Sequence, residues 1–223
     1  SVPQVSFTVF ADDDLGSVRV IVENTTFTEA VSGGNAPAWT GTKVDKWVSL
    51  DKTSSAITCI KDAIESSGFT QQGADDGYIS EIAGLAAFDG GSMSGWMGTL
   101  NDWFTNEGLT AYTVANGKLA SGDEIRMQYT MDWGADLGND WSGTDTSLKA
   151  ISSDYGTLSP EFSAKTYNYT LTVPFGTKSI NFRPTALNKK FKTVSKIGDK
   201  TLSLTKPTEI KDGDVITVTV GEG

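Results

Sequence analysis

The sequence contains no histidine and only one cysteine, and these two absences exclude many common catalytic and metal centres. Without imidazole, a Ser-His-Asp triad, a Cys-His dyad and histidine-ligated zinc cannot form. A single cysteine, Cys59, excludes disulfides within the chain and thiolate metal cages. Cys59 falls between Ile57 and Ile60 in a helical pattern, so we expect a buried structural thiol rather than a nucleophile.

Long apolar runs and basic clusters are also missing. No stretch approaches the roughly 18 consecutive apolar residues that a membrane-spanning helix needs. The net charge is −10, from 28 acidic and 18 basic residues. This balance repels nucleic acid and anionic lipid. The sequence therefore predicts no nucleic-acid partner and no membrane insertion.

The low cysteine content, together with many Thr, Ser, Gly and Asn residues, is typical of an exported bacterial surface protein. The chain opens at Ser1-Val2-Pro3, without the charged and apolar regions of a signal peptide. We interpret it as an exported chain whose signal segment is absent from this sequence. The expected location is extracellular or at the cell surface.

The first half of the chain combines strand patterns with one helical pattern. Apolar residues at every second position predict strands over 5–9, 18–22, 47–50, 78–82, 95–100, 111–114 and 125–131. The acidic loop Asp12–Asp14 would join the first two strands as a hairpin. Apolar residues at helical spacing predict one helix over 54–67, which Ser54 or Ser55 can cap and Gly68 can end. This order predicts a mixed sheet with one helix across it.

The second half reads as a small all-β module over residues 148–220. Tyr167, Tyr169, Leu171 and Val173 would share one strand face, and the run 213–220 would close the module. Residues 134–147, rich in Gly, Asp, Ser and Thr, predict the boundary. We therefore expect two domains, 1–143 and 144–223. The predicted fold class is mainly β and α+β overall, with a mixed sheet in front and a β-sandwich behind.

Two family resemblances sharpen this prediction. The C-terminal one rests on Gly156, Leu158-Ser159-Pro160, Phe162, Tyr167, Tyr169, Val173 and Gly213. With these residues, the segment of about 147–220 resembles the cadherin-like β-sandwich domain of bacterial surface proteins. The resemblance implies an Ig-like spacer in a modular extracellular chain.

The N-terminal resemblance rests on Ile79, Ile82, Gly95-Trp96-Met97, Asn101, Tyr112, Gly122-Asp123-Glu124-Ile125 and Tyr129. With these residues, the segment of about 5–131 looks like the transcobalamin-like C-terminal domain. The resemblance implies a β-grasp fold and a possible small-molecule ligand such as cobalamin or another corrinoid. The chain departs from the family at Asn101-Asp102, where the family has Asn-Gly, and adds the aromatic pair Trp103-Phe104.

Aromatic residues supply the candidate binding site. The chain has six tryptophans, and exposed aromatics bind sugars, flat ligands or protein partners by stacking and burial. Trp96 lies in a strand pattern and favours core packing, whereas Trp103, Trp133 and Trp141 lie in polar, Gly-rich segments. The methionines could line an adaptable pocket or fill the core. The candidate binding residues are Trp96, Met97, Trp103, Phe104, Trp133 and Trp141.

Acidic residues suggest a second, weaker site. Asp132, Asp136 and Asp140 are spaced by four, and oxygen-rich loops can hold Ca²⁺. The spacing does not match an EF-hand, so a solvated acidic loop is the alternative. Paired carboxylates could also serve a glycosidase. Nothing in the sequence marks one carboxylate as buried and another as solvated, so we expect no catalytic residues, and no cofactor beyond a possible Ca²⁺ or corrinoid.

Three hypotheses follow for function. The first is a non-enzymatic surface protein that recognises an extracellular protein or glycan and carries a β-sandwich spacer. The second is a small-molecule binder, for a corrinoid by resemblance. The third, an enzyme that acts on glycans, lacks a recognisable catalytic arrangement.

Overall fold

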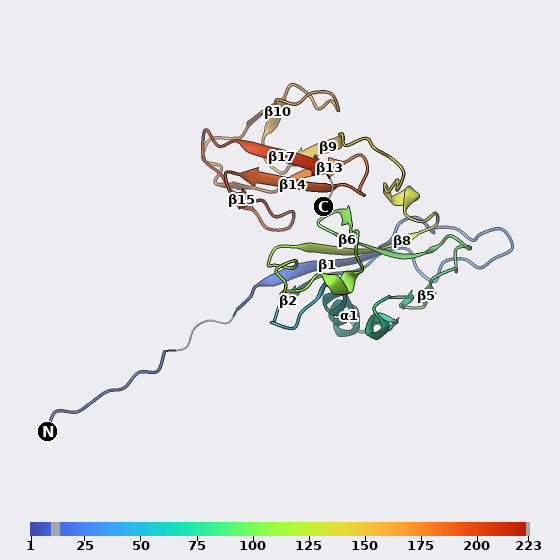
Figure 1. Cartoon of the computed structure of the whole chain (residues 1–223), viewed down its shortest axis with the longest axis horizontal. Helices are drawn as coiled ribbons and strands as arrows, with labels where there is room; N and C mark the ends of the chain where they lie inside the picture. Colours follow the sequence, from blue (N-terminus) through green and yellow to red (C-terminus); the bar gives the residue numbers. More distant parts are fainter. Residues whose placement is uncertain (10–13, 222–223) are drawn as a thin grey trace.

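The computed structural model describes residues 1–9 and 14–221. It is mainly β, with the helix and strands of the first half forming one unit and a set of small sheets forming the other (Figure 1). We call β1 to β8 with α1 the N-terminal module, and β9 to β17 the C-terminal module. The domain boundary expected between residues 143 and 144 stays a prediction.

A five-stranded mixed sheet forms the N-terminal module, with strand order β2-β1-β8-β6-β7. The central pair, β1 and β8, is parallel, with Val20 opposite Ile125, and the other pairs are antiparallel. This order, with one helix across the sheet, is the β-grasp arrangement that the sequence predicts. The strands are β1 (Ser17–Asn24), β2 (Gly41–Ser49), β6 (Gly95–Leu100), β7 (Trp103–Phe104) and β8 (Glu124–Thr130).

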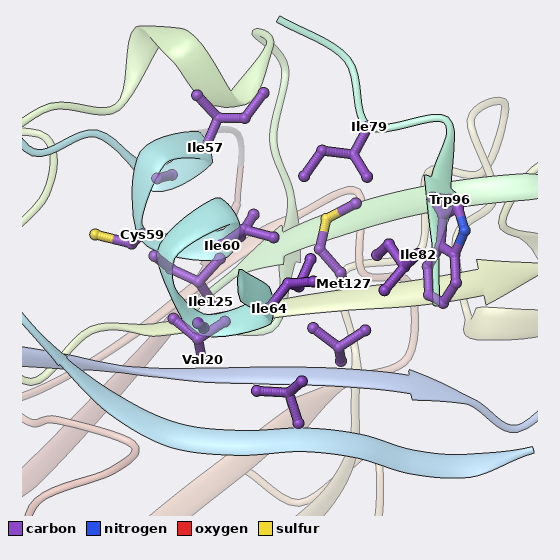
Figure 2. Close-up of a cluster of buried hydrophobic side chains, with 14 of the residues drawn as sticks. Val20, Ile57, Cys59, Ile60, Ile64, Ile79, Ile82, Trp96, Ile125 and Met127 are labelled. Carbon is purple, nitrogen blue, oxygen red and sulfur yellow. The ribbon is translucent and has the colours of Figure 1, made fainter. Parts of the chain in front are cut away.

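The predicted helix is confirmed as α1 (Ala56–Ser66). Ser55 caps it in a capping box: Ser55 Oγ accepts from the backbone N–H of Thr58, and Thr58 Oγ1 accepts from the N–H of Ser55. Gly68 follows the end with a φ of +84°, which suits glycine. Ile57, Ile60 and Ile64 of the helix are buried, and Ile60 and Ile64 lie on its side toward the strands (Figure 2).

The core of this module lies between α1 and one face of the sheet. Val20, Ile125 and Tyr129 are completely buried there, and Ile79, Ile82 and Trp96 close the side of the cluster (Figure 2). Burial of this much apolar surface is the main stabilising force of a domain. Cys59 is 2% exposed, and burial raises the pKa of its thiol to about 11, so it is the structural thiol that we expected.

The small elements of this half all follow α1 along the chain. Strands β3 (Gln71–Gln72), β4 (Glu81–Ile82) and β5 (Leu85–Ala86) form a short sheet, and 3-10 turns occur at Ala74–Asp76, Leu109–Ala111 and Ala135–Leu137. None of the helices in the described ranges is long and apolar enough to cross a membrane.

Three strand predictions in this half need correction. Residues 5–9 form no strand and are exposed throughout. Their predicted hairpin loop includes Asp12 and Asp13, which lie outside the described residues. Residues 111–114 form a turn, with a single β-bridge between Thr113 and Ser55. Of the predicted strand over 78–82, only Glu81–Ile82 is a strand. Apolar residues at every second position show that a segment could bury one face as a strand. A strand also needs a neighbouring strand to pair with, and the alternation does not predict one.

The C-terminal module is a sandwich of short strands. They are β9 (Leu148–Ser153), β10 (Thr157–Ser159), β11 (Thr170–Thr172), β12 (Ser179–Ile180), β13 (Phe182–Ala186), β14 (Lys192–Ile197), β15 (Lys200–Thr201), β16 (Thr208–Glu209) and β17 (Ile216–Gly221). The largest sheet has the order β15-β14-β17. The fully buried apolar centre consists of Ile180, Phe182 and Leu202. The predicted strand over 167–173 shortens to β11, and Tyr167 is exposed rather than on the buried face.

The C-terminal module lies against the sheet face opposite α1 (Figure 1). Arg183 of β13 donates two hydrogen bonds to the carboxylate of Glu124 in β8, at 2.9 and 3.1 Å. Lys189 pairs with Asp102 at 2.9 Å. The hydroxyls of Ser203 and Thr205 both donate to the carbonyl of Gly122, at 2.6 Å each. Several segments of both modules therefore form the joint, and bidentate arginine pairing fixes its geometry.

Candidate binding site at the tryptophan loop

The segment between the two modules, residues 131–143, carries the two most exposed tryptophans, and we call it the tryptophan loop. Trp133 is 63% exposed and Trp141 is 55% exposed. Both line one shallow pocket of about 520 Å³, which we call the tryptophan pocket. The complete lining is Asp132, Trp133, Ala135, Gly138, Asn139, Asp140, Trp141, Ser142 and Leu187.

The first half of the loop is fixed by the end of β8. Thr130 Oγ1 accepts hydrogen bonds from the N–H groups of Asp132 and Gly134, at 3.1 and 2.8 Å, and itself donates to Asp136. The other oxygen of Asp136 accepts from the N–H of Met131 at 2.8 Å. The turn holds Trp133 at a φ of +51°, a conformation that is rare for a bulky residue and is found mainly where function requires it.

The second half of the loop is held by the C-terminal module. Asn188 Oδ1 accepts from the N–H of Asp140 at 3.0 Å, and its Nδ2 donates to the carbonyl of Asp140 at 2.7 Å. Lys190 Nζ donates to the carbonyl of Trp141 at 2.8 Å, and the N–H of Lys189 donates to the carbonyl of Gly138 at the same distance. The loop that looks like a linker in the sequence is therefore bound on both sides.

The pocket also contains an unsatisfied amide. Asn139 is only 2% exposed, and neither its Oδ1 nor its Nδ2 has a hydrogen-bond partner in the part of the chain that the structure describes. A buried amide without partners costs free energy, and such groups are uncommon in folded proteins. Since an amide can both donate and accept, Asn139 suits a small polar group that enters from the pocket.

Carboxylates complete the pocket rim. Asp140 accepts from Ser142 Oγ and from the Ser142 N–H, at 3.0 and 3.1 Å, and these hydrogen bonds lower the pKa of Asp140. Asp132 also lines the pocket. The rim is acidic at neutral pH, which favours neutral or cationic ligands over anions.

The predicted Ca²⁺ ligands do not converge. Asp136 turns back to Thr130 and Met131, and Asp140 binds Ser142. Within residues 1–9 and 14–221, no group of three or more His, Cys, Asp or Glu side chains is placed to hold a metal ion. The 3-10 turn Ala135–Leu137 separates Asp132 from Asp140, and Asp136 and Asp140 each accept hydrogen bonds from neighbouring residues instead of sharing a site.

The remaining predicted binding residues are positioned below the surface. Trp96 is buried, its indole N–H donates to the carbonyl of Leu85 at 2.9 Å, and its ring stacks on Trp39. Met97 is half-buried and lies against Gly134, so it supports the tryptophan loop from below. The structure thus brings Met97 to the same region as Trp133, but not as an exposed contact.

Trp103 and Phe104 contact this chain's own C-terminal module. Trp103 is 4% exposed, and its indole N–H donates to the carbonyl of Lys190 at 3.0 Å. The N–H of Phe104 donates to the carbonyl of Lys189 at 2.9 Å. The interpretation of Trp103 as an exposed loop residue is therefore wrong: the residues that cover it are far away in the sequence.

A second, larger cavity lies between the modules, and we call it the intermodule cleft. Its volume is about 790 Å³. Asn101, Asp102, Trp103 and Asp123 line it on one side, and residues 192–196 of β14 line it on the other. Burial raises the pKa of Asp123, whose two oxygens already accept from Asn101 Nδ2 and the N–H of Ala120, at 3.0 and 2.8 Å. This carboxyl therefore stabilises a turn.

Sequence reasoning did not identify Asn139, Leu187 and Asn188 as site residues. Leu187 and Asn188 belong to a different module, and asparagine in a loop carries no distinguishing pattern. The sequence pointed to this part of the chain through its tryptophans, Trp133 and Trp141, and through the spacing of Asp132, Asp136 and Asp140.

Comparison with known proteins identifies part of the N-terminal module. Residues 54–131 match the model of DUF4430, a domain of unknown function. It is a domain of the transcobalamin-like family. The DUF4430 match covers α1 to β8 and ends at the first residue of the tryptophan loop. The search of curated proteins finds no match.

Proposed function

We propose that this chain is a non-enzymatic recognition module of a bacterial cell surface, and that the tryptophan pocket binds a neutral carbohydrate. The observation that carries the proposal is the pair of exposed indoles, Trp133 and Trp141, on one small pocket. An exposed indole presents a rigid apolar face that loses little conformational entropy on binding. A sugar ring offers a matching apolar face of C–H groups, with hydroxyls around its edge.

The polar residues of the pocket support a sugar over a purely apolar partner. Asn139 supplies both a donor and an acceptor, and Asp132 and Asp140 supply acceptors for hydroxyl groups. The chain carries a net charge of −10, so an acidic sugar would be repelled while a neutral one would not. The joint supports binding as well, because a loop that is ordered in advance loses less entropy when the ligand arrives.

A glycan array followed by calorimetry on the best ligand tests this proposal. We expect Trp133→Ala and Trp141→Ala each to weaken binding by about thirtyfold or more, because hot-spot aromatics contribute about 2 kcal/mol or more. Trp47→Ala is the matched control, since Trp47 is 43% exposed but lies on β2, outside the pocket. The proposal fails if no glycan binds, or if Trp47→Ala weakens binding as much as the pocket variants.

The intermodule cleft favours a second candidate function. Its volume falls in the range of small-molecule sites, and it includes the Asn101-Asp102 turn at which the chain departs from the transcobalamin-like pattern. A flat ligand such as a corrinoid would lie between Trp103 and the β14 residues that line the cleft. A visible spectrum after incubation with cobalamin and desalting tests this candidate: retained colour supports it, and a colourless protein contradicts it.

The cell-surface location and the spacer role of the cadherin-like C-terminal module are part of the same proposal. The composition and the sandwich fold support them. Antibody labelling of intact producing cells should give a surface signal; a signal that appears only after the cells are broken would contradict the surface location.

A further inference from the structure

Strand β17 has an unusual free edge. Among the described residues, β14 is its only neighbour in the sheet. Its sequence, Ile-Thr-Val-Thr-Val-Gly, contains no charged residue and no proline. Proteins normally block a free edge with such residues, and the edge strand β2 follows this rule with Lys43, Asp45 and Lys46. The edge of β17 is therefore open to another strand.

The N-terminal segment, residues 4–9, has the complementary character. Its sequence is Gln-Val-Ser-Phe-Thr-Val, also without charge or proline. Val5, Phe7 and Val9 are 75%, 86% and 90% exposed, although they alternate with polar residues as in a half-buried strand. The segment forms no strand within this chain and extends away from the C-terminal module in Figure 1.

The two strands match in their alternation. In β17, Ile216 and Val218 face the apolar centre of the C-terminal module, while Thr217 and Thr219 are exposed. An added strand would place Val5, Phe7 and Val9 beside the apolar row, and Ser6 and Thr8 beside the threonines. Ile216 and Val218 are only half-buried, and no described strand is hydrogen-bonded to the far edge of β17. The added side chains would cover them.

We propose that residues 4–9 of one copy of this chain add as a strand to the β17 edge of a second copy. Backbone hydrogen bonds along the edge supply affinity, and the alternating apolar side chains set the register. The two contacting surfaces differ, so the association is head-to-tail. Such contacts form open chains or rings rather than a closed dimer of two identical surfaces.

Sedimentation velocity of the full chain over a wide concentration range tests the proposal. We expect dimers and longer species that increase with concentration. Phe7→Asp should reduce the association constant by at least about tenfold, since it places a charge on the buried side of the added strand. Thr8→Asp is the matched control: it adds the same charge on the exposed side and should change the constant by less than about threefold. Neither residue contacts the folded core, so both variants fold.

Cross-linking between copies locates the contact. Thr8→Cys chains are mixed with Thr217→Cys chains and treated with a short thiol cross-linker. The native Cys59 does not compete, because it is buried and the pKa of its thiol is raised to about 11. We expect a cross-linked pair with Thr217→Cys and none with Asp45→Cys on the charged β2 edge. A monomer at all concentrations, equal loss with both aspartate variants, or cross-linking to β2 would overturn the proposal.

Discussion

The two modules differ in how much of their stability lies inside them. The N-terminal module has a deep core in which Val20, Ile60, Ile125 and Tyr129 are completely buried. The hydrophobic cluster of the C-terminal module has three buried side chains, surrounded by half-buried ones such as Ile216 and Val218. We therefore expect the N-terminal module to owe most of its stability to its own core. The C-terminal module should depend more on the joint, where Arg183, Lys189 and Ser203 bind the N-terminal module. The C-terminal module in turn holds the second half of the tryptophan loop through Asn188.

Truncation of one buried side chain in each module should give the largest difference. Ile60→Ala should lower the free energy of unfolding by about 4 kcal/mol, and Leu202→Ala by about 2 kcal/mol. Ile60 is completely buried, so its truncation would leave a cavity enclosed on all sides, whereas Leu202 lies in a smaller cluster. Urea denaturation followed by circular dichroism measures both. Equal losses would show that the two cores are equivalent and would break the comparison.

Removal of the joint arginine should have the next largest effect. Arg183→Ala leaves Glu124, whose side chain is 3% exposed, with Arg126 as its remaining cationic partner. We expect a loss of about 2 kcal/mol, below the cost of breaking a fully buried pair because Arg183 itself is partly exposed. Arg19→Ala is the control, since its pair with Asp45 is exposed and should contribute less than about 1 kcal/mol. A similar loss in both variants would contradict a special role for the joint.

Acid should weaken the joint before it weakens the core. Burial alone would raise the pKa of Glu124, but the hydrogen bonds and charges of Arg183 and Arg126 outweigh it and hold the pKa below its ordinary value. The ionised carboxylate therefore stabilises the folded state above about pH 4.3, and this contribution is lost as the pH falls through the lowered pKa. Urea titrations between neutral and acidic pH should show this decline in the native chain, and a smaller decline in Arg183→Ala. An equal decline in both would assign the acid effect to other groups.

The smallest effect concerns the tether of the tryptophan loop. Asn188→Ala removes both hydrogen bonds to the backbone of Asp140 and should lower stability by about 1 kcal/mol. Hydrogen exchange at the Asp140 amide should accelerate, and Trp141 should become easier to quench with acrylamide. Asn168→Ala serves as the control, because Asn168 is exposed in the C-terminal module. Unchanged hydrogen exchange at the Asp140 amide would show that the loop keeps its conformation without the Asn188 hydrogen bonds.

Local patterns predicted the elements whose determinants are local. Helix α1 has both its apolar period and its cap within a few residues, and β6 and β8 carry their alternation within one strand. The pattern over Val5–Val9 is equally clear, yet the described chain offers it no partner. Trp103 and Trp133 look alike in sequence, but contacts with Tyr112 and with residues 189–192 bury the indole of Trp103, whereas that of Trp133 stays exposed. The roles of Asn139 and Asn188 depend on such long-range contacts, which a single sequence does not reveal.

Asn188 makes its two hydrogen bonds to residue 140 with the main chain, not with the side chain. A mutation at 140, or at the neighbouring indole positions, can therefore alter what the pocket prefers without disturbing how the loop is mounted. The indoles of the pocket and the asparagine that holds the second half of the loop therefore lie in different segments of the chain, so one can change while the other stays as it is.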